Sequence, residues 1–155
     1  MARVVSTLVQ VHVARPSDQQ WEHLLLRRTD TDAEYAGLWQ CITGRIGAGE
    51  HALDAAEREL VEETGLKALQ WWSLPVVGTY FDRHEDAVVL PVVFGAVVSS
   101  EAIPCLSEHA EFRWFDCAAA IGFLPVLAQQ QATIVFDYVL SDSDNSWLPR
   151  LYRIR

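Results

Sequence analysis

The chain has no excess of positive charge. Its 155 residues carry 12 Lys and Arg against 21 Asp and Glu, which gives a formal net charge of -9 at pH 7. Proteins that bind a nucleic-acid backbone carry a basic patch or stripe, so this balance argues against a nucleic-acid polymer as partner. If the ligand is instead a phosphorylated small molecule, this negatively charged protein must create a region of positive electrostatic potential to bind it. Bound divalent cations would do so.

Cysteines and long apolar segments are also scarce. The three cysteines, Cys41, Cys105 and Cys117, are an odd number without metal-type spacing, which indicates reduced structural thiols. The longest apolar run, residues 87–98, contains a proline and a glycine and is too short to cross a bilayer. Residues 1–6 do not lead into the apolar segment of a signal peptide. We therefore expect a cytoplasmic protein without a membrane partner, as a monomer or a homodimer.

Half of the residues are apolar, which suits one domain of residues 1–155 with a hydrophobic core. Alternation of apolar and polar residues, or a short apolar run, predicts a strand, and apolar residues that recur every 3.6 positions predict a helix. Gly65 is expected to end the first helix. The expected strands are 4–14 and 22–28 as a hairpin around a turn at 15–18, then 38–43, 76–81, 87–98 and 111–115. Strand 87–98 is apolar on both faces, so we place it centrally, with its proline at a bulge or edge. The expected helices are 51–64 and a second long one over 124–139, with loops at 29–37 and 141–146. This order predicts an α/β fold with a mixed sheet between helices.

The first expected helix carries one acidic face. At 100° per residue, Glu59, Glu62 and Glu63 fall within an arc of about 100°. Such a face is commonly just solvated. However, the like-charge pairs at i,i+3 and i,i+4 each cost about 0.2–0.5 kcal/mol, and Arg58 is the only base between residues 52 and 66. Converging carboxylates suit a hard cation such as Mg²⁺ or Mn²⁺. These residues alone leave both interpretations open.

The same stretch contains a longer motif. It reads Gly44-x5-Glu50-x7-Arg58-Glu59-Leu60-x-Glu62-Glu63-x-Gly65-Leu66. This string resembles the Nudix box, the signature of the Nudix hydrolase superfamily, whose fold is an α/β/α sandwich. The resemblance implies that Glu59, Glu62 and Glu63 hold Mg²⁺ or Mn²⁺. It also implies that Glu50 assists from the loop, that Arg58 orients the carboxylates, and that the backbone carbonyl near Thr43 faces a metal. Many members have Pro-Gly-Gly where this chain has Ile42-Thr43-Gly44, which weakens the expectation for Thr43.

A narrower resemblance lies outside the box. The strings Trp39-Gln40-x-x-Thr43-Gly44 and Ser107-Glu108-His109, continuing to Asp116, are similar to the subgroup that includes dihydroneopterin triphosphate pyrophosphatase. This likeness implies that Glu108 completes the metal site or acts as the general base, with Glu59 as the next candidate. An isolated glutamate is more often an ordinary loop acid, and that alternative stays open. Glu111 and His109 are weaker candidates.

Substrate contacts are expected from three further residues. Arg27 and Arg28 end the second strand on opposite faces, and we choose Arg28 for the substrate phosphate or base. Trp39 would stack on a flat heterocycle, unless it is simply a core residue. Phe81 is a comparable candidate. The expected reaction is the attack of water on phosphorus, with metal-bridged phosphates and a carboxylate base. The alternative is a Nudix-fold module that binds a nucleotide without cleaving it, although such a module would be expected to have lost box glutamates.

Overall fold

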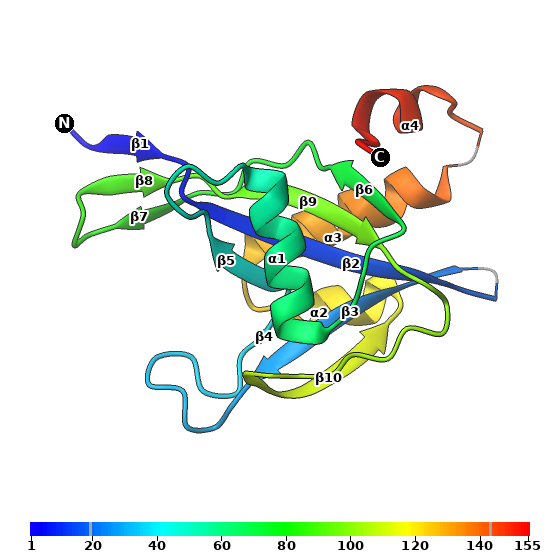
Figure 1. The fold of residues 1–155 in the computed structure, drawn as a ribbon, viewed down its shortest axis with the longest axis horizontal. Helices are drawn as coiled ribbons and strands as arrows, with labels where there is room; N and C mark the ends of the chain where they lie inside the picture. Colours follow the sequence, from blue (N-terminus) through cyan, green and yellow to red (C-terminus); the bar gives the residue numbers. More distant parts are fainter. Residues whose placement is uncertain (19, 143) are drawn as a thin grey trace.

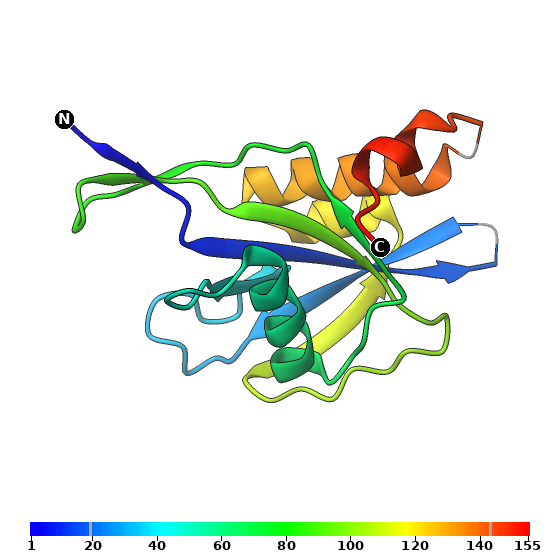
Figure 2. The same cartoon turned by 45° about the horizontal axis from the view of Figure 1, so that its top comes forward.

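The computed structural model describes residues 1–18, 20–142 and 144–155. Its main body is a seven-stranded mixed sheet with the order β10-β3-β2-β9-β6, in which β4 also pairs with β3 and β5 with β2. Helix α1 lies on one face of this sheet, and α2 and α3 lie on the other (Figures 1 and 2). The strands are β1 (Arg3–Val5), β2 (Leu8–Ser17), β3 (Gln20–Arg28), β4 (Trp39–Gln40), β5 (Ile42–Arg45), β6 (Gln70–Ser73), β7 (Tyr80–Asp82), β8 (Ala87–Val89), β9 (Val92–Val97) and β10 (His109–Phe115). The helices are α1 (Ala52–Thr64), α2 (Cys117–Phe123), α3 (Leu127–Ser141) and α4 (Trp147–Tyr152). The predicted α/β class with a mixed sheet between helices is confirmed.

Side-chain alternation along the central strands divides the core into two layers. On β2, Val9, Val11 and Val13 pack with Ala56 and Leu60 of α1, whereas Ala14 packs with Phe136 of α3. Successive residues of a strand point to opposite faces, so the three valines face the α1 layer while His12 and Ala14 face α3. Strand β2 pairs with β9 in parallel, which places the apolar β9 inside the sheet as predicted.

Three of the predicted strands are each divided in the structure. The expected 38–43 strand becomes β4, which pairs with β3, and β5, which pairs with β2. The first expected strand becomes β1 and β2, and the expected 87–98 strand becomes β8 and β9, separated around Pro91. Strands β1, β8 and β7 form a second, three-stranded sheet that projects from the main body (Figure 2). Of the expected 76–81 strand, only residues 80 and 81 belong to a ladder, as part of β7. Proline lacks the N–H that a central ladder requires, which is the physical reason for the break near Pro91.

The remaining corrections concern short elements. The hairpin of β2 and β3 is present, but both strands extend further than predicted, so its turn begins at Asp18 rather than Arg15. The second long helix begins at Leu127; Leu124 instead caps α2. The patterns did not predict β6, α2 or α4. Ser141 belongs to α3, and residue 143 of the expected 141–146 loop lies outside the described residues.

Among the described residues, no helix combines the length and apolar character required to cross a membrane.

Candidate active site

Helix α1 is fixed against the sheet by its apolar side. Ala56, Leu60 and Thr64 are almost completely buried, and Leu53 packs against the same core. The helix ends as predicted at Gly65, whose φ of 67° is the left-handed conformation that glycine adopts without strain. With this side held against the sheet, Glu59 and Glu63 face the end of β5 and a cavity beside it.

Gly44 on β5 makes room for the carboxylate of Glu59. A β-carbon built on Gly44 would overlap the Cγ, Cδ and Oε1 atoms of Glu59. The glycine is therefore required by the close approach of a functional side chain rather than by its own backbone conformation. This contact joins the loop half of the box to its helical half.

Arg58 connects four groups of the box. Its Nε donates to Glu50 Oε1 at 2.9 Å, and its Nη2 donates to Glu50 Oε2 at 3.0 Å. Its Nη1 donates to Glu59 Oε1 at 2.7 Å and to Glu62 Oε2 at 3.2 Å, and Nη2 also reaches the Arg45 carbonyl at 2.9 Å. A planar guanidinium suits this forked arrangement. These contacts would allow Arg58 to hold carboxylates in place, which is the role that the resemblance implies.

Glu50 is engaged by its neighbours rather than directed into the cavity. The Arg58 guanidinium and, less strongly, the Gly47 N–H lower the pKa of Glu50 to about 2. The carboxylate is therefore ionised at neutral pH, with both oxygens already accepting hydrogen bonds. In this arrangement Glu50 supports Arg58, and its Oε1 atom, which accepts a single hydrogen bond, keeps a second lone pair.

An acidic cavity of about 220 Å³ lies beside α1. It brings together five of the predicted site residues, namely Arg28, Thr43, Glu59, Glu63 and Glu108. Its other lining residues are Thr29, Asp32, Gln40 and His109. The carboxylates come from α1, from Asp32 in the 29–37 loop and from the residue before β10, so distant parts of the chain converge here.

Glu63 is the most perturbed acid of the cavity. The residue is only 7% exposed, and burial, followed by the negative charges of Glu59 and Glu108, raises the pKa of Glu63 to about 8. Its Oε2 atom is buried without a hydrogen-bond partner among the described residues. His109 Nδ1 lies 3.7 Å away, but burial and then the Arg28 charge lower the pKa of that imidazole. A buried carboxylate oxygen without a donor, beside two further carboxylates, fits a divalent cation.

Arg28 supplies the positive charge of the same cavity. Its Nη1 donates to Asp32 Oδ2 at 2.7 Å and its Nε to Gln40 Oε1 at 3.2 Å. Backbone N–H of Tyr35 and then the Arg28 side chain lower the pKa of Asp32 to about 2, so this pair is charged on both sides. Arg27 pairs instead with Asp30 and lines neither this cavity nor its neighbour. The two arginines diverge as alternation predicts.

A second cavity of about 250 Å³ adjoins the acidic one and shares Arg28, Gln40 and Thr43 with it. Its walls combine aromatic and apolar side chains with two glutamine amides. They are Leu8, Val9, Gln10, Tyr35, Leu38, Tyr80, Pro91, Val126 and Gln129. Flat rings with hydrogen-bonding edges suit such a lining.

Five predicted residues line neither cavity, namely Glu50 and Arg58, which pair with each other, and Glu62, Trp39 and Phe81. The Glu62 side chain is 58% exposed, and its one ion pair among the described residues is with Arg58. Trp39 packs edge-to-face with Phe115 and Phe123, at ring-centroid distances of 6.0 and 5.7 Å. Phe81 lies on β7 in the projecting sheet and is 58% exposed. The structure therefore does not bring Trp39 or Phe81 to the cavities.

Sequence reasoning missed several lining residues. Asp32 and Tyr35 lie in the 29–37 loop, and Gln129 lies on α3. The acidic residues that follow Arg28, Asp30 and Asp32, could have indicated that this loop lines the site, because an arginine at the end of a strand is commonly paired with a nearby acid. Gln10 and Gln129 gave none, since a polar residue in an apolar pattern does not reveal which cavity it lines.

Comparison with known proteins agrees with this architecture. An octanoyltransferase from Myxococcus xanthus is 36% identical over 126 residues, which are 76% of this chain and 32% of that protein. An RNA pyrophosphohydrolase from Mesorhizobium japonicum is 50% identical over 46 residues, which are 28% of this chain and 27% of that protein. The chain thus matches about a third or less of the length of these relatives.

A solved structure and a family match identify the domain. The Escherichia coli dihydroneopterin triphosphate pyrophosphohydrolase superposes with a TM-score of 0.70 at 21% identity, covering 89% of this chain and 99% of that one. At this identity the likeness shows the fold alone. The family described as NUDIX domain matches residues 7–138, which include the whole box and both cavities. The chain therefore belongs to the NUDIX family.

Proposed function

We propose that this protein is a Mg²⁺- or Mn²⁺-dependent hydrolase of a diphosphate linkage, acting on a nucleoside or pterin triphosphate or a related nucleoside diphosphate derivative. One observation carries the proposal. The buried carboxyl of Glu63 lies beside Glu59 and Glu108 in a cavity that also holds Arg28, and an aromatic cavity adjoins it. Such a pair of cavities can take the phosphates and the ring of one substrate.

The metal would be held by residues that already face the acidic cavity. Glu59, Glu63 and Glu108 offer carboxylate oxygens, and Thr43 lines the same space. Glu62 could join them by turning from its exposed position. A bound divalent cation would neutralise phosphate charge and make a bound water more acidic. Arg58 and Glu50 would keep the Glu59 carboxylate in place while it does so.

Among the carboxylates, Glu108 is the best candidate for the general base. The Glu59 carboxylate already accepts a hydrogen bond from Arg58 at 2.7 Å, which holds it in place. Glu63 is more deeply buried. No side-chain hydrogen bond or ion pair of Glu108 is found within the described residues, so it can turn toward an attacking water.

The adjoining cavity supports a flat heterocycle as the non-phosphate part of the substrate. Tyr35 and Tyr80 line it, and Arg28 stands 5.6 Å from the ring of Tyr35. Arg28 also borders the acidic cavity, so it can reach a phosphate while the ring occupies its neighbour. Purine and pterin rings share the size and the hydrogen-bonding edges that this lining suits.

The test is a phosphate- and pyrophosphate-release screen with Mg²⁺ and Mn²⁺. Substrates would include canonical and oxidised nucleoside triphosphates, dihydroneopterin triphosphate, dinucleoside polyphosphates, ADP-ribose and coenzyme A. Glu63→Gln should abolish turnover, and Glu111→Gln is the matched control, because Glu111 pairs with Arg113 outside both cavities. Substrate binding without turnover in the wild type would favour the non-cleaving module. Equal turnover by both variants would refute this metal site.

The role of Glu108 needs a separate measurement. If it removes the proton from water, Glu108→Gln should lower kcat by about 100-fold or more and remove the acidic limb of the pH–rate profile. If it is only a metal ligand, raising the Mg²⁺ concentration should restore much of the rate. An unchanged rate and profile would move the base to Glu59.

A further inference from the structure

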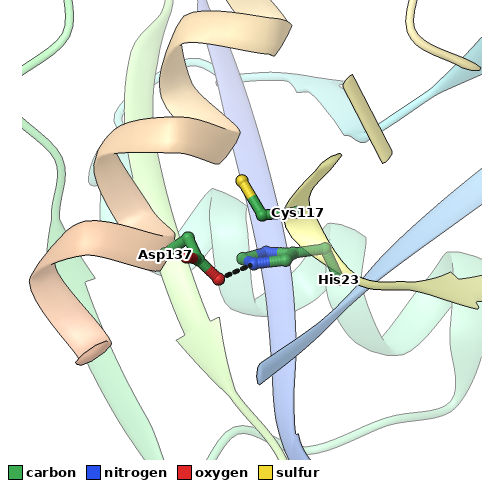
Figure 3. Close-up of side chains that lie close together, drawn as sticks. All are labelled: His23, Cys117 and Asp137. Carbon is green, nitrogen blue, oxygen red and sulfur yellow. Dashed lines mark hydrogen bonds and ion pairs between the residues drawn. The ribbon is translucent and has the colours of Figure 1, made fainter. Parts of the chain in front are cut away.

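A second group of ligand-type side chains lies on the other face of the sheet. His23 of β3, Cys117 at the start of α2 and Asp137 of α3 converge there, as Figure 3 shows. One potential ligand atom from each lies within 4.8 Å of the other two. His23 is 2% exposed, and its Nε2 lies 2.9 Å from Asp137 Oδ1. The box residues face the α1 side, so the two groups share no side chain.

The cluster is polar in a place where packing alone would favour apolar residues. The His23 ring packs against Phe136 at 6.2 Å, within the core between the sheet and α3. Its only side-chain hydrogen bond is to Asp137, and Nδ1 has no partner among the described residues. Burying an imidazole and a carboxylate costs free energy unless they are well paired. The two groups are thus held together with few other interactions.

The thiol is not arranged as a nucleophile. Burial, and then the charges of Asp137 and Asp116, raise the pKa of Cys117 to about 11, so the thiol is protonated at neutral pH. No hydrogen bond links its sulfur to His23 within the described part of the chain. A thiolate nucleophile needs an activating partner, which is missing here. A metal ion, by contrast, would itself displace the thiol proton.

We propose that His23, Cys117 and Asp137 form a binding site for Zn²⁺ or a similar borderline-soft divalent cation, with one position left for water. Imidazole, thiolate and carboxylate are the ligands that zinc takes in proteins. Zinc–ligand bonds of about 2.0–2.3 Å place ligand atoms roughly 3.3–3.8 Å apart. The His23–Asp137 pair, at 2.9 Å, would have to separate slightly, and any pair near the 4.8 Å limit would have to approach by about 1 Å. The Asp137 side chain is 29% exposed, which gives it room to move and the ion a route in.

The ligand chemistry separates this site from the box. The box offers carboxylate and carbonyl oxygens, which suit Mg²⁺ and Mn²⁺, whereas a thiolate selects against them. The sequence spacing conceals the site, because its three residues come from separate elements of the fold. A local cysteine–histidine motif would have shown it.

Cobalt titration of metal-free protein tests the proposal directly. One equivalent of Co²⁺ should produce a near-ultraviolet thiolate-to-cobalt band and visible d–d bands, and Zn²⁺ should remove both. Cys117→Ser should abolish the thiolate band, while the matched Cys105→Ser should retain it, since Cys105 is exposed and lies outside the cluster. Asp137→Asn should weaken Zn²⁺ binding at least tenfold in competition with a chromophoric chelator.

Stability gives a second measurement in case a variant folds poorly. With the box carboxylates saturated by Mg²⁺, one equivalent of Zn²⁺ should raise the Tm of the wild type and of Cys105→Ser, but not that of Cys117→Ser. Glu63→Gln should keep the cobalt band, which separates this site from the proposed active site. The proposal is overturned if no thiolate band appears, or if the band survives in Cys117→Ser.

Discussion

Replacing Glu63 by glutamine should make the metal-free protein more stable while destroying its activity. The change keeps the shape of the side chain and removes its charge. In the folded protein, burial and the neighbouring Glu59 and Glu108 raise the pKa of Glu63 to about 8, against an ordinary value of 4.5. The unfolded chain therefore loses this proton at a much lower pH than the native chain does.

The size of the effect follows from that difference in pKa. Below pH 4.5 the carboxyl is protonated in both states and costs nothing. Between pH 4.5 and 8 the native state binds more protons than the unfolded state, so stability falls as pH rises, by up to about 1.4 kcal/mol per pH unit. At pH 7 the penalty is about 3 kcal/mol, and at pH 5 it is about 1 kcal/mol. The amide of Glu63→Gln does not titrate, so the variant escapes this penalty.

The assay is thermal and urea unfolding in EDTA at pH 5 and pH 7. For a domain of this size, about 3 kcal/mol corresponds to a rise in Tm of roughly 6–12 °C at pH 7, shrinking at pH 5. Glu62→Gln is the matched control, because its side chain is 58% exposed. Mg²⁺ should stabilise the wild type and not Glu63→Gln. The reasoning fails if Glu63→Gln has the stability of the wild type at both pH values, or if Glu62→Gln gains as much.

Three further changes test other parts of the structure. Gly44→Ala should displace the Glu59 carboxylate and lower kcat at least tenfold with little change in Tm, whereas Gly122→Ala, which faces open space, should leave both unchanged. Arg58→Lys loses the fork to Glu50 and should lower kcat more than it raises KM; normal kcat with a tenfold higher KM would instead make Arg58 a substrate contact. Burial and His23 lower the pKa of His12 to about 3, so His12 alone should cost about 2 kcal/mol of stability at pH 5, which offsets the gain from protonating Glu63. On going from pH 7 to pH 5, urea unfolding should therefore show that His12→Gln gains about 2 kcal/mol relative to the wild type, and an equal change in both proteins would contradict this account.

Local signals predicted α1 and its carboxylates well. The helix begins and ends where the pattern places it, and Gly65 ends it because its left-handed conformation depends only on neighbouring residues. The positions of Glu59 and Glu63 on one side of the helix follow from the helical repeat. The apolar side of the helix, which includes Leu60, packs against the sheet, and this fixes the direction in which the two glutamates point. That apolar side is also visible in the sequence.

Features that depend on distant pairing were not predictable in the same way. The short β1 joins a separate sheet because it pairs with β8, more than 80 residues away. Trp39 has a side chain that could stack on a flat ring, but in β4 this side chain packs against Phe115 and Phe123 instead. Phe81 is in a similar position, since pairing of β7 with β8 carries it into the projecting sheet. Such outcomes depend on tertiary packing, which overrides local pattern.

Strand β3 explains how one sheet can serve two unlike sites. His23 and Arg28 are five residues apart, an odd number, so alternation directs them to opposite faces. Arg28 then meets the carboxylates of the acidic cavity on the α1 side, and His23 meets Asp137 on the α3 side. A slip of one residue in the pairing of β3 would exchange the two side chains and bury Arg28 under α3 without its partner Asp32. The register of β3 is therefore constrained from both faces, and the two sites use different side chains.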